Sequence, residues 1–259
     1  MIWLCCFVVE NQVRMNSLKY NNCLVFIIIF MYIHFISLFP ELYKSFLSTS
    51  LIQKAQEKKL LFFSLHNPRE FCENKHQQID DQIYWWWDWM LIKAKPIVDC
   101  VESVIRDYKL KHEDFSIVFP APAKEVFNQK IAYWLSKKDH IIFVSWRYEG
   151  IDYRCEKYLQ KNYPEQFKKI SLWSFIVLWW ETPSMVMTEA IVRLIPWVIK
   201  EKGSRIDESY SLKEGMENLE APNYTRPAEV FGMKVPDELL TWDDEQVKQW
   251  RKKNQSSVN

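Results

Sequence analysis

Residues 115–160 read FSIVFPAPAKEVFNQKIAYWLSKKDHIIFVSWRYEGIDYRCEKYLQ, and this stretch decides the fold. Two apolar runs, at 115–119 and 140–145, have the length and the β-branched and aromatic content of buried strands. Each run is followed by a helical pattern, at 124–137 and 152–160. Strands that alternate with helices in this way predict an α/β domain with a largely parallel sheet.

The same alternation extends on both sides of this stretch. Further strands are expected at 32–39, 60–65 and 170–178, and further helices at 40–58, 96–108, 182–199 and 245–253. Pro40 stands at the first helical position, where proline is favoured. Residues 67–90 are expected to form a long polar loop. Residues 200–222 are charged and weakly apolar, which predicts a mobile linker before a small helical appendage.

Composition narrows the class of protein. With 48% hydrophobic and 26% charged residues, the chain is an ordinary globular protein. A net charge of +1 neither demands nor excludes a nucleic-acid partner. The six cysteines contain no C-x-x-C pair, which favours a reducing cytosol over a disulfide framework or a zinc site. We therefore expect a cytoplasmic protein without a structural metal.

The N-terminal region allows two interpretations. Residues 23–39 form an apolar run, CLVFIIIFMYIHFISLF, which is short for a spanning helix and has no cluster of Lys or Arg before it. Its second half resembles a buried first strand, and Met31 stands directly before that strand. We expect translation to start at Met31, with residues 1–30 as an upstream extension and no stable membrane association. The alternative is a membrane-tethered protein anchored by residues 23–39.

Tryptophan and glycine occur in unusual numbers. The chain contains 13 Trp and only 4 Gly, whereas average usage of about 7% would give roughly 18 Gly. Tryptophans cluster in YWWWDWM at 84–90 and in LWWE at 178–181. Neither run has a helical or strand period, and both become plausible backbone loops when the tryptophans are replaced by glycine.

Several ordered blocks resemble one family. They are ISLFP at 36–40, HQQIDD at 76–81, YWWWDWM at 84–90, WRYEGID at 146–152, SLWSF at 171–175, WWE at 179–181, RLIPWV at 193–198 and YTRP at 224–227. Together they resemble bacterial tRNA (guanine-N1-)-methyltransferases, the TrmD family of the SPOUT superfamily. The resemblance covers residues 31 to about 253.

Ten tryptophans fall on glycine positions of that family: 85, 86, 87, 89, 146, 173, 179, 180, 197 and 242. We interpret this as translation with UGA read as tryptophan where the source organism reads glycine. Loops that wrap a cofactor need glycine for positive φ and close approach. The alternative is that residues 85–89 form a real base-stacking platform.

The resemblance implies a trefoil-knotted α/β fold in which S-adenosyl-L-methionine binds, and a homodimer with shared active sites that methylates N1 of guanosine 37 in tRNA. The implied cofactor-binding residues are Pro120, Ala121, Trp146, Tyr148, Glu149, Gly150, Leu172, Trp173, Phe175, Val177, Trp179 and Trp180. PAPA at 120–123 departs from the family's S-P-Q-G. If the tryptophans are real, the alternative is a catalytically inactive RNA-binding relative.

The resemblance also implies catalytic and tRNA-binding residues. A carboxylate base would remove the N1 proton, and a cationic or hydrogen-bonding partner near O6 would stabilise the charge that develops there. Glu208 aligns with the family's catalytic Asp, Asp207 is the reserve candidate, and Arg193 would orient the base or stabilise O6. The expected tRNA contacts are Lys75, His76, Asp80 and Arg226; His76 could instead cap its loop.

The expected domains follow from these assignments. Residues 1–30 are an extension, 31–199 the knotted cofactor-binding domain, 200–222 a flexible catalytic linker and 223–259 a small tRNA-binding helical domain. Asp80 and Asp81 lack a third ligand, so we expect them to organise the loop or meet the flipped base, and we predict no metal site.

Overall fold

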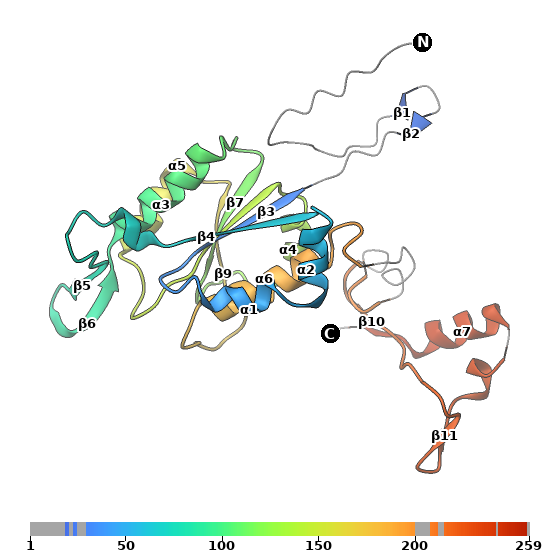
Figure 1. Cartoon of the computed structure of the whole chain (residues 1–259). Helices are drawn as coiled ribbons and strands as arrows, with labels where there is room; N and C mark the ends of the chain where they lie inside the picture. Colours follow the sequence, from blue (N-terminus) through green and yellow to red (C-terminus); the bar gives the residue numbers. More distant parts are fainter. Residues whose placement is uncertain are drawn as a thin grey trace, which may run out of the picture. The chain divides into compact units, whose positions relative to one another are not determined.

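The computed structural model describes residues 19–20, 23–24, 30–199, 208–211, 215–241 and 243–257. Its centre is a five-stranded sheet in the order β4-β3-β8-β7-β9 (Figure 1). The strands are β3 (Met31–Ile36), β4 (Leu61–His66), β7 (Phe115–Pro120), β8 (His140–Val144) and β9 (Phe167–Ile170). Every neighbouring pair is parallel. The predicted α/β class with a mostly parallel sheet is confirmed.

Strand β3 lies inside the sheet, with β4 on one side and β8 on the other. Ile33 and Phe35 are fully buried, and a strand covered on both faces reads as a continuous apolar run. Residues 31–36 of the apolar N-terminal run are therefore a core strand. In the part of the chain that the structure describes, no helix is long and apolar enough to cross a membrane.

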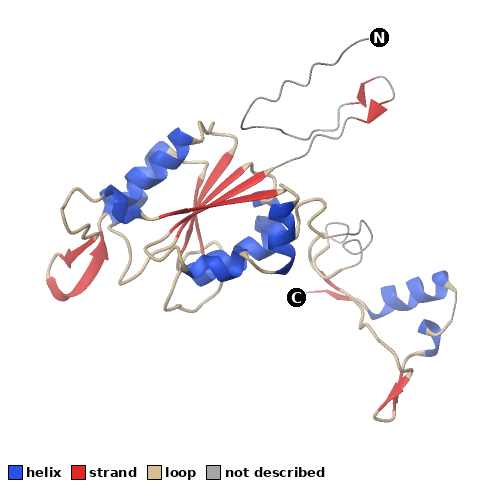
Figure 2. Cartoon of the chain, in the orientation of Figure 1, coloured by secondary structure: helices blue, strands red, loops and turns tan. Residues whose placement is uncertain are grey.

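Helices cover both faces of the sheet (Figure 2). One face packs against α1 (Leu42–Leu47), α2 (Ser50–Glu57), α4 (Gln129–Leu135) and α6 (Glu181–Val192). The other face packs against α3 (Ala94–Asp107) and α5 (Tyr153–Asn162). Each face has its own apolar core, which is the three-layer solution for a parallel sheet.

Three predicted helices are shorter than their sequence patterns. The helix expected at 182–199 is α6, which ends at Val192. The helix expected at 40–58 is divided because the hydroxyls of Ser48 and Thr49 donate to the carbonyls of Ser45 and Phe46, in competition with the backbone. The helix expected at 124–137 begins only at α4, where the Asn128 side chain accepts a hydrogen bond from the amide of Ile131. An Asn at this position is a favoured N-cap.

Two further predictions are wrong in detail. The strand expected at 170–178 is β9, which ends at Ile170; residues 171–180 form a loop in which Ile176 and Leu178 are 80% and 84% exposed. The region 67–90, expected to be loop, contains a short 3-10 helix, Pro68–Phe71, and the hairpin of β5 (Asp80–Ile83) and β6 (Trp86–Ile92). Polar residues interrupt the apolar pattern of the hairpin, so its strand period was not recognised in the sequence.

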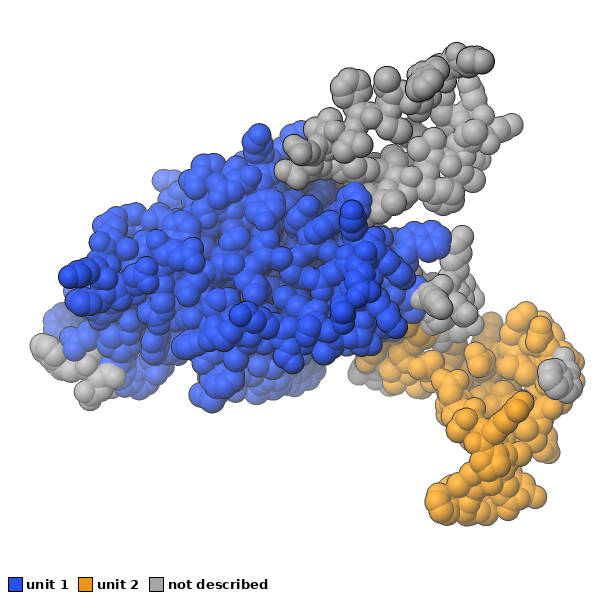
Figure 3. Space-filling view, viewed as in Figure 1, with its two compact units in different colours: residues 1–199 blue, residues 200–259 orange. Residues whose placement is uncertain are grey.

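The chain divides into two compact units, residues 1–199 and 200–259 (Figure 3). In unit 1, two further short strands pair, β1 (Lys19–Tyr20) with β2 (Cys23–Leu24). The helical appendage expected in unit 2 is only partly helical. Beside α7 (Asp244–Asn254) and a 3-10 turn (Asp237–Leu239), it has the paired strands β11 (Glu229–Val230) and β12 (Met233–Lys234), and β10 (Asn218–Leu219) pairs with β13 (Ser256–Ser257).

Candidate functional site

Three loops meet at one edge of the sheet. They follow β7, β8 and β9, which are neighbours in the sheet and parallel, so their carboxyl ends lie together. The loops after β7 and β9 are joined by backbone hydrogen bonds, from the amide of Ala121 to the carbonyl of Ile170 at 3.0 Å and from the amide of Phe127 to the carbonyl of Ser171 at 2.8 Å. These are the three segments that the resemblance assigns to the cofactor.

Two indoles fill the space among these loops. The ring of Trp146, after β8, stacks on the ring of Trp180 at 4.6 Å between centroids and 19° between planes. Trp146 Nε1 donates to the carbonyl oxygen of Pro120, at the end of β7, at 3.0 Å. Trp180 is 5% exposed. A single pair of rings therefore connects all three loops.

Two residues beside the Trp146–Trp180 stack have the positive φ angles that are typical of glycine. Gly150 has φ +131°, and a Cβ there would lie 3.6 Å from the Trp146 ring. Tyr148 has φ +58° although it carries a side chain, which is half exposed. The exposed Glu149 donates its amide to the carbonyl of Met90 at 3.3 Å. This loop thus holds backbone geometry that costs energy for residues other than glycine.

The remaining predicted cofactor residues lie in the loop after β9. Leu172 and Val177 are partly buried, whereas Trp173, Phe175 and Trp179 are exposed by 65%, 54% and 43%. Only Trp180 of this loop joins the stack with Trp146. The loop is held at its start by the Ser171 hydroxyl, which donates to the carbonyl of Trp173.

Sequence reasoning missed a buried ion pair behind the loops. Arg147 Nη2 lies 3.4 Å from Oε2 of Glu181, and the side chains are 14% and 1% exposed. The Ser37 hydroxyl donates to the other carboxylate oxygen at 2.7 Å. The Arg147 guanidinium also lies over the rings of Phe39 and Trp179, at 4.4 and 4.5 Å. Both residues lie within the motif blocks, but their 34-residue separation gave no sign of the pairing.

A hydroxyl cluster anchors the loop after β8 to the helix that follows β9. Tyr43 Oη lies 2.9 Å from Oγ of both Ser145 and Ser184, and the Ser145 hydroxyl lies 3.2 Å from the Trp180 carbonyl oxygen. Burial raises the pKa of the Tyr43 hydroxyl well above its usual value. The hydroxyl groups of the cluster are therefore neutral, and their hydrogen bonds hold the start of the loop after β8 and the end of the loop after β9.

The predicted catalytic residues are divided between the two units. Arg193 is the C-cap of α6 in unit 1 and is partly buried. Glu208 belongs to unit 2, where its carbonyl accepts a hydrogen bond from the Asn218 side chain at 3.1 Å. Asp207 lies outside the described residues. The catalytic assignment of these three residues stays a prediction.

The predicted tRNA contacts include exposed residues in both units. Lys75 and His76 are exposed in a turn that Asn74 holds through hydrogen bonds to and from Gln78. Asp80 begins β5 and is partly buried, and Arg226 is exposed in unit 2. The neighbouring carboxylate Asp81 pairs with Lys93 at 3.5 Å, as expected for a loop-organising residue. Among the described residues, no cluster of three or more metal-ligating side chains occurs.

Fold and site together define a class. The chain contains an α/β domain in which three loops meet at the carboxyl edge of a parallel sheet, the edge where such sheets bind ligands. A family model described as tRNA (Guanine-1)-methyltransferase TrmD matches residues 31–258. The chain belongs to this family.

Individual relatives agree with the family match. The chain is 38% identical over 221 residues to a tRNA (guanine-N(1)-)-methyltransferase of Dictyoglomus turgidum, covering 85% of this chain and 83% of the relative. It is 36% identical over 223 residues to the protein of that name from Bacillus subtilis and 37% identical over 223 residues to that from Anoxybacillus flavithermus, covering 86% of each chain.

Proposed function

We propose that this protein is a methyltransferase that transfers the methyl group of S-adenosyl-L-methionine to N1 of guanosine 37 in tRNA, next to the anticodon. The family match and the names of the relatives support the reaction class. One structural observation carries the proposal further: the loops after β7, β8 and β9 converge on a space that now holds the Trp146 ring. A tRNA substrate is consistent with the expected cytoplasmic location.

The chemistry of this space fits the cofactor. The Trp146 indole shows that the space accepts a planar bicyclic ring whose N–H group donates to the Pro120 carbonyl oxygen. Adenine is also a planar bicyclic ring with N–H donors. Backbone groups of Ala121, Gly150 and Leu172, together with the other predicted cofactor residues, would hold the molecule. When bound, it supplies an electrophilic methyl group on a sulfonium.

We further propose that the ten tryptophans at family glycine positions are glycines in the natural protein. Two of them support this independently of the alignment, because Trp85 has φ +76° and Trp197 has φ +72°. Such angles are rare for bulky residues and ordinary for glycine. Trp146 and Trp180 support it too, since they occupy the space that a cofactor needs. The source gene should have UGA at these ten codons; UGG at most of them contradicts the proposal.

Residues of this chain would perform the proton transfer. The carboxylate of Glu208, with Asp207 in reserve, removes the proton from N1 while negative charge moves toward O6. The guanidinium of Arg193 stabilises that charge. Residues 200–222 would carry the base as a linker, and residues 223–259, including Arg226, would contact the tRNA backbone.

The protein would work as a homodimer with shared active sites. Exposed apolar side chains gather in the loop after β9: Phe175, Ile176 and Leu178 are between 54% and 84% exposed. Contiguous exposed apolar surface indicates an interaction site. A second copy of this loop region is the partner we propose.

A methylation assay tests the proposed function. The protein with Trp→Gly at all ten positions is incubated with a tRNA transcript that has guanosine 3′ of the anticodon and with S-adenosylmethionine carrying a labelled methyl group. We expect 1-methylguanosine at that position, and none with a transcript that has adenosine there. The chain with tryptophans should be inactive. Absence of 1-methylguanosine with the glycine protein contradicts the proposal.

A further inference from the structure

A large open groove lies between the β5–β6 hairpin and the first turn of α5. Its volume is about 1200 Å³, and its polar and aromatic lining includes Asp81, Tyr84, Lys93, Asp152, Tyr153 and Arg154. None of Tyr84, Lys93, Tyr153 and Arg154 belongs to the predicted cofactor, catalytic or tRNA residues. The volume exceeds the usual range for a single small ligand.

The groove borders the proposed cofactor site. The amide of Ile92 donates to the carbonyl of Gly150 at 3.0 Å, and the amide of Asp152 donates to the carbonyl of Ile92 at 2.9 Å. These bonds attach the hairpin to the loop after β8, one of the three loops around Trp146. A ligand in the groove would therefore lie beside one of the three loops of the proposed cofactor site.

Two aromatic rings that line the groove are exposed to solvent. Tyr84 is 86% exposed and Tyr153 is 59% exposed. Neither ring belongs to the buried core, although Lys157 Nζ lies 5.3 Å from the centroid of the Tyr153 ring. Exposed rings that line a groove are typical stacking surfaces for the bases of unpaired nucleotides.

Two cations are held in place at the same groove. Arg154 pairs with Asp152 through Nε at 3.0 Å and through Nη2, and its side chain remains 78% exposed. Lys93 Nζ lies 3.5 Å from Asp81. The Lys93 ammonium also donates to the Gln78 carbonyl at 3.3 Å, and its side chain is 35% exposed. Arg154 is the more accessible cation, and guanidinium donors that remain accessible suit phosphate oxygens.

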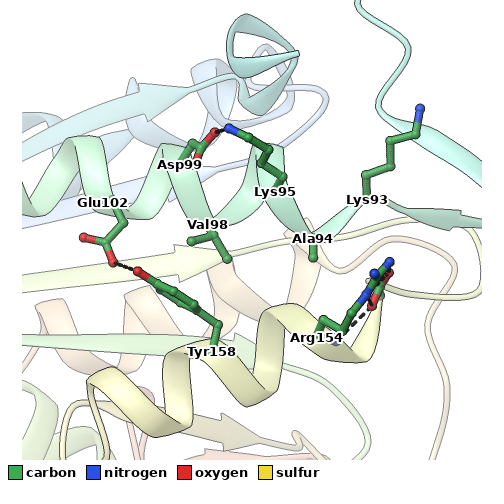
Figure 4. A pocket seen from close by; sticks show the side chains of 9 residues that line it. Lys93, Ala94, Lys95, Val98, Asp99, Glu102, Arg154 and Tyr158 are labelled. Atoms are coloured by element: carbon green, nitrogen blue, oxygen red, sulfur yellow. Dashed lines mark hydrogen bonds and ion pairs between the residues drawn. The ribbon is translucent and has the colours of Figure 1, made fainter. Parts of the chain in front are cut away.

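The charged lining continues into a second cavity of about 500 Å³ that shares Lys93, Asp152 and Arg154 with the groove (Figure 4) and contains carboxylates and cations in equal number. There Lys95 pairs with Asp99 at 2.6 Å, and Tyr158 donates to Glu102 at 3.2 Å. The two cavities adjoin at these shared residues, and the second is lined by residues of α3 and α5.

We propose that this groove binds unpaired nucleotides of the tRNA that flank the methylated guanosine, with bases stacked on Tyr84 and Tyr153 and phosphates contacted by Arg154 and Lys93. The inference rests on the proposed function, because it takes tRNA as the substrate. Alternating exposed rings and oriented cations favour RNA over an acidic peptide, which has no flat bases for the rings. One disputed tryptophan, Trp85, also lines the groove, but none of the four residues proposed to contact the RNA is tryptophan.

Binding of the full chain to a fluorescent anticodon stem-loop RNA tests the groove. Tyr84→Ala combined with Tyr153→Ala should weaken binding about tenfold or more, and Tyr84→Phe with Tyr153→Phe should retain it, because the phenyl rings still stack. Arg154→Gln should weaken binding and reduce the slope of log K against log salt by about 1. The matched control is Tyr133→Ala with Lys137→Gln, a surface pair on the opposite face with Nζ 4.5 Å from the ring centroid; it should leave binding unchanged.

A fully paired RNA hairpin without the loop separates bases from backbone. The tyrosine variants should not alter its affinity. Equal losses for the hairpin and the stem-loop, or unchanged stem-loop binding in the alanine variants, overturn the inference while the proposed function stands. If the unsubstituted chain and the glycine protein both fail to bind and methylate tRNA, the proposed function itself fails.

Discussion

The indole of Trp146 lies flat on the indole of Trp180, with ring centroids 4.6 Å apart, in the middle of the three loops that close the carboxyl edge of the sheet. Trp146 also donates to the Pro120 carbonyl oxygen. If the proposed cofactor site is right, the stack lies where a bound cofactor would make its contacts. It stabilises the chain as written and at the same time blocks the proposed site.

Removal of the stack should create cofactor binding. The variant Trp146→Gly/Trp180→Gly should have a lower melting temperature than the unsubstituted chain, because truncation of buried aromatic rings costs several kcal/mol, about 3–5 for Trp→Ala. S-adenosylmethionine should then raise it: at 100 times Kd, binding contributes about 2.7 kcal/mol, which is roughly 5–10 °C at this chain length. Thermal unfolding with increasing cofactor measures both effects.

Trp134→Gly in α4 is the control for this experiment, because Trp134 lies in α4, outside the three loops. It should gain no cofactor response. An equal response of the unsubstituted chain would show that the indoles do not occupy the cofactor site.

Positive φ angles allow a test of glycine identity by stability alone. At Trp85 and Trp197, with φ +76° and +72°, replacement by Gly should give a more stable protein than replacement by Ala. A Cβ in this region costs about 1–2 kcal/mol, and the lower chain entropy of Ala offsets about 0.4–1 kcal/mol of it. The expected difference is about 0.5–1 kcal/mol, measured by urea unfolding.

In α4 the order should reverse. At Trp134, Ala should be more stable than Gly by about 1 kcal/mol, because glycine is a poor residue in a helix. If Ala were more stable than Gly at all three positions, the backbone strain at Trp85 and Trp197 would be relieved in solution.

The sequence predicted the sheet well where strands are apolar on both faces. β3, β7 and β8 contain the fully buried Phe35, Ile117 and Phe143, so each reads as a continuous apolar run. β9 was misplaced because Lys168 and Lys169 occupy its middle, while the more apolar residues after Ile170 leave the sheet. The edge strand β4 is less buried but was also predicted, because LFFSL at 61–65 is nearly all apolar.

The candidate site was predicted less evenly. The motif blocks identified the three loops, and these loops do converge. A motif block reflects local backbone requirements, such as the positive φ of Gly150, and these can be recognised in the sequence. They did not reveal that Arg147 and Glu181 pair, since an ion pair across 34 residues leaves no local pattern. The roles of Arg193 and Glu208 stay predictions.

A chain of three histidines should make the fold sensitive to acid. His34 lies between His66 and His140, with ring nitrogens 3.2 and 3.1 Å apart. Burial, then the neighbouring His140 and His66, lowers the pKa of His34 to about 2, and burial lowers the pKa of His140 to about 4. The unfolded chain therefore binds protons below its histidine pKa of about 6.5 that the folded chain does not bind.

The free energy of unfolding should be highest above pH 6.5 and should fall as the pH decreases toward 4. Each histidine contributes about 1.4 kcal/mol per pH unit well below 6.5, so unfolding free energy should fall by about 2 kcal/mol between pH 6 and pH 5. Urea titrations across this range measure it. His34→Gln should reduce the slope by about half, whereas His76→Gln, at an exposed position, should not change it. A free energy of unfolding that does not vary from pH 7 to pH 5 would contradict the prediction that these histidines stay neutral in the folded protein.

Two adjacent carboxylates compete for the role of general base, and kinetics can separate them. In the protein with glycine at the ten positions, Glu208→Gln should lower kcat by about 10²–10⁴, because an amide of nearly the same shape cannot accept the N1 proton. KM for tRNA should change little, since the loss lies in the transition state. Asp207→Asn should retain kcat within about threefold.

Glu208→Asp provides the decisive comparison, because the carboxylate remains but is one methylene shorter. It should recover most of the activity lost in Glu208→Gln, since the family carries Asp at the aligned position, and the fall of kcat at acid pH should persist in it and disappear in Glu208→Gln. Arg193→Lys should lower kcat while that acid limb persists, because it weakens stabilisation of O6 and leaves the base intact. A large loss of kcat in Asp207→Asn with full activity in Glu208→Gln would assign the base to Asp207 instead.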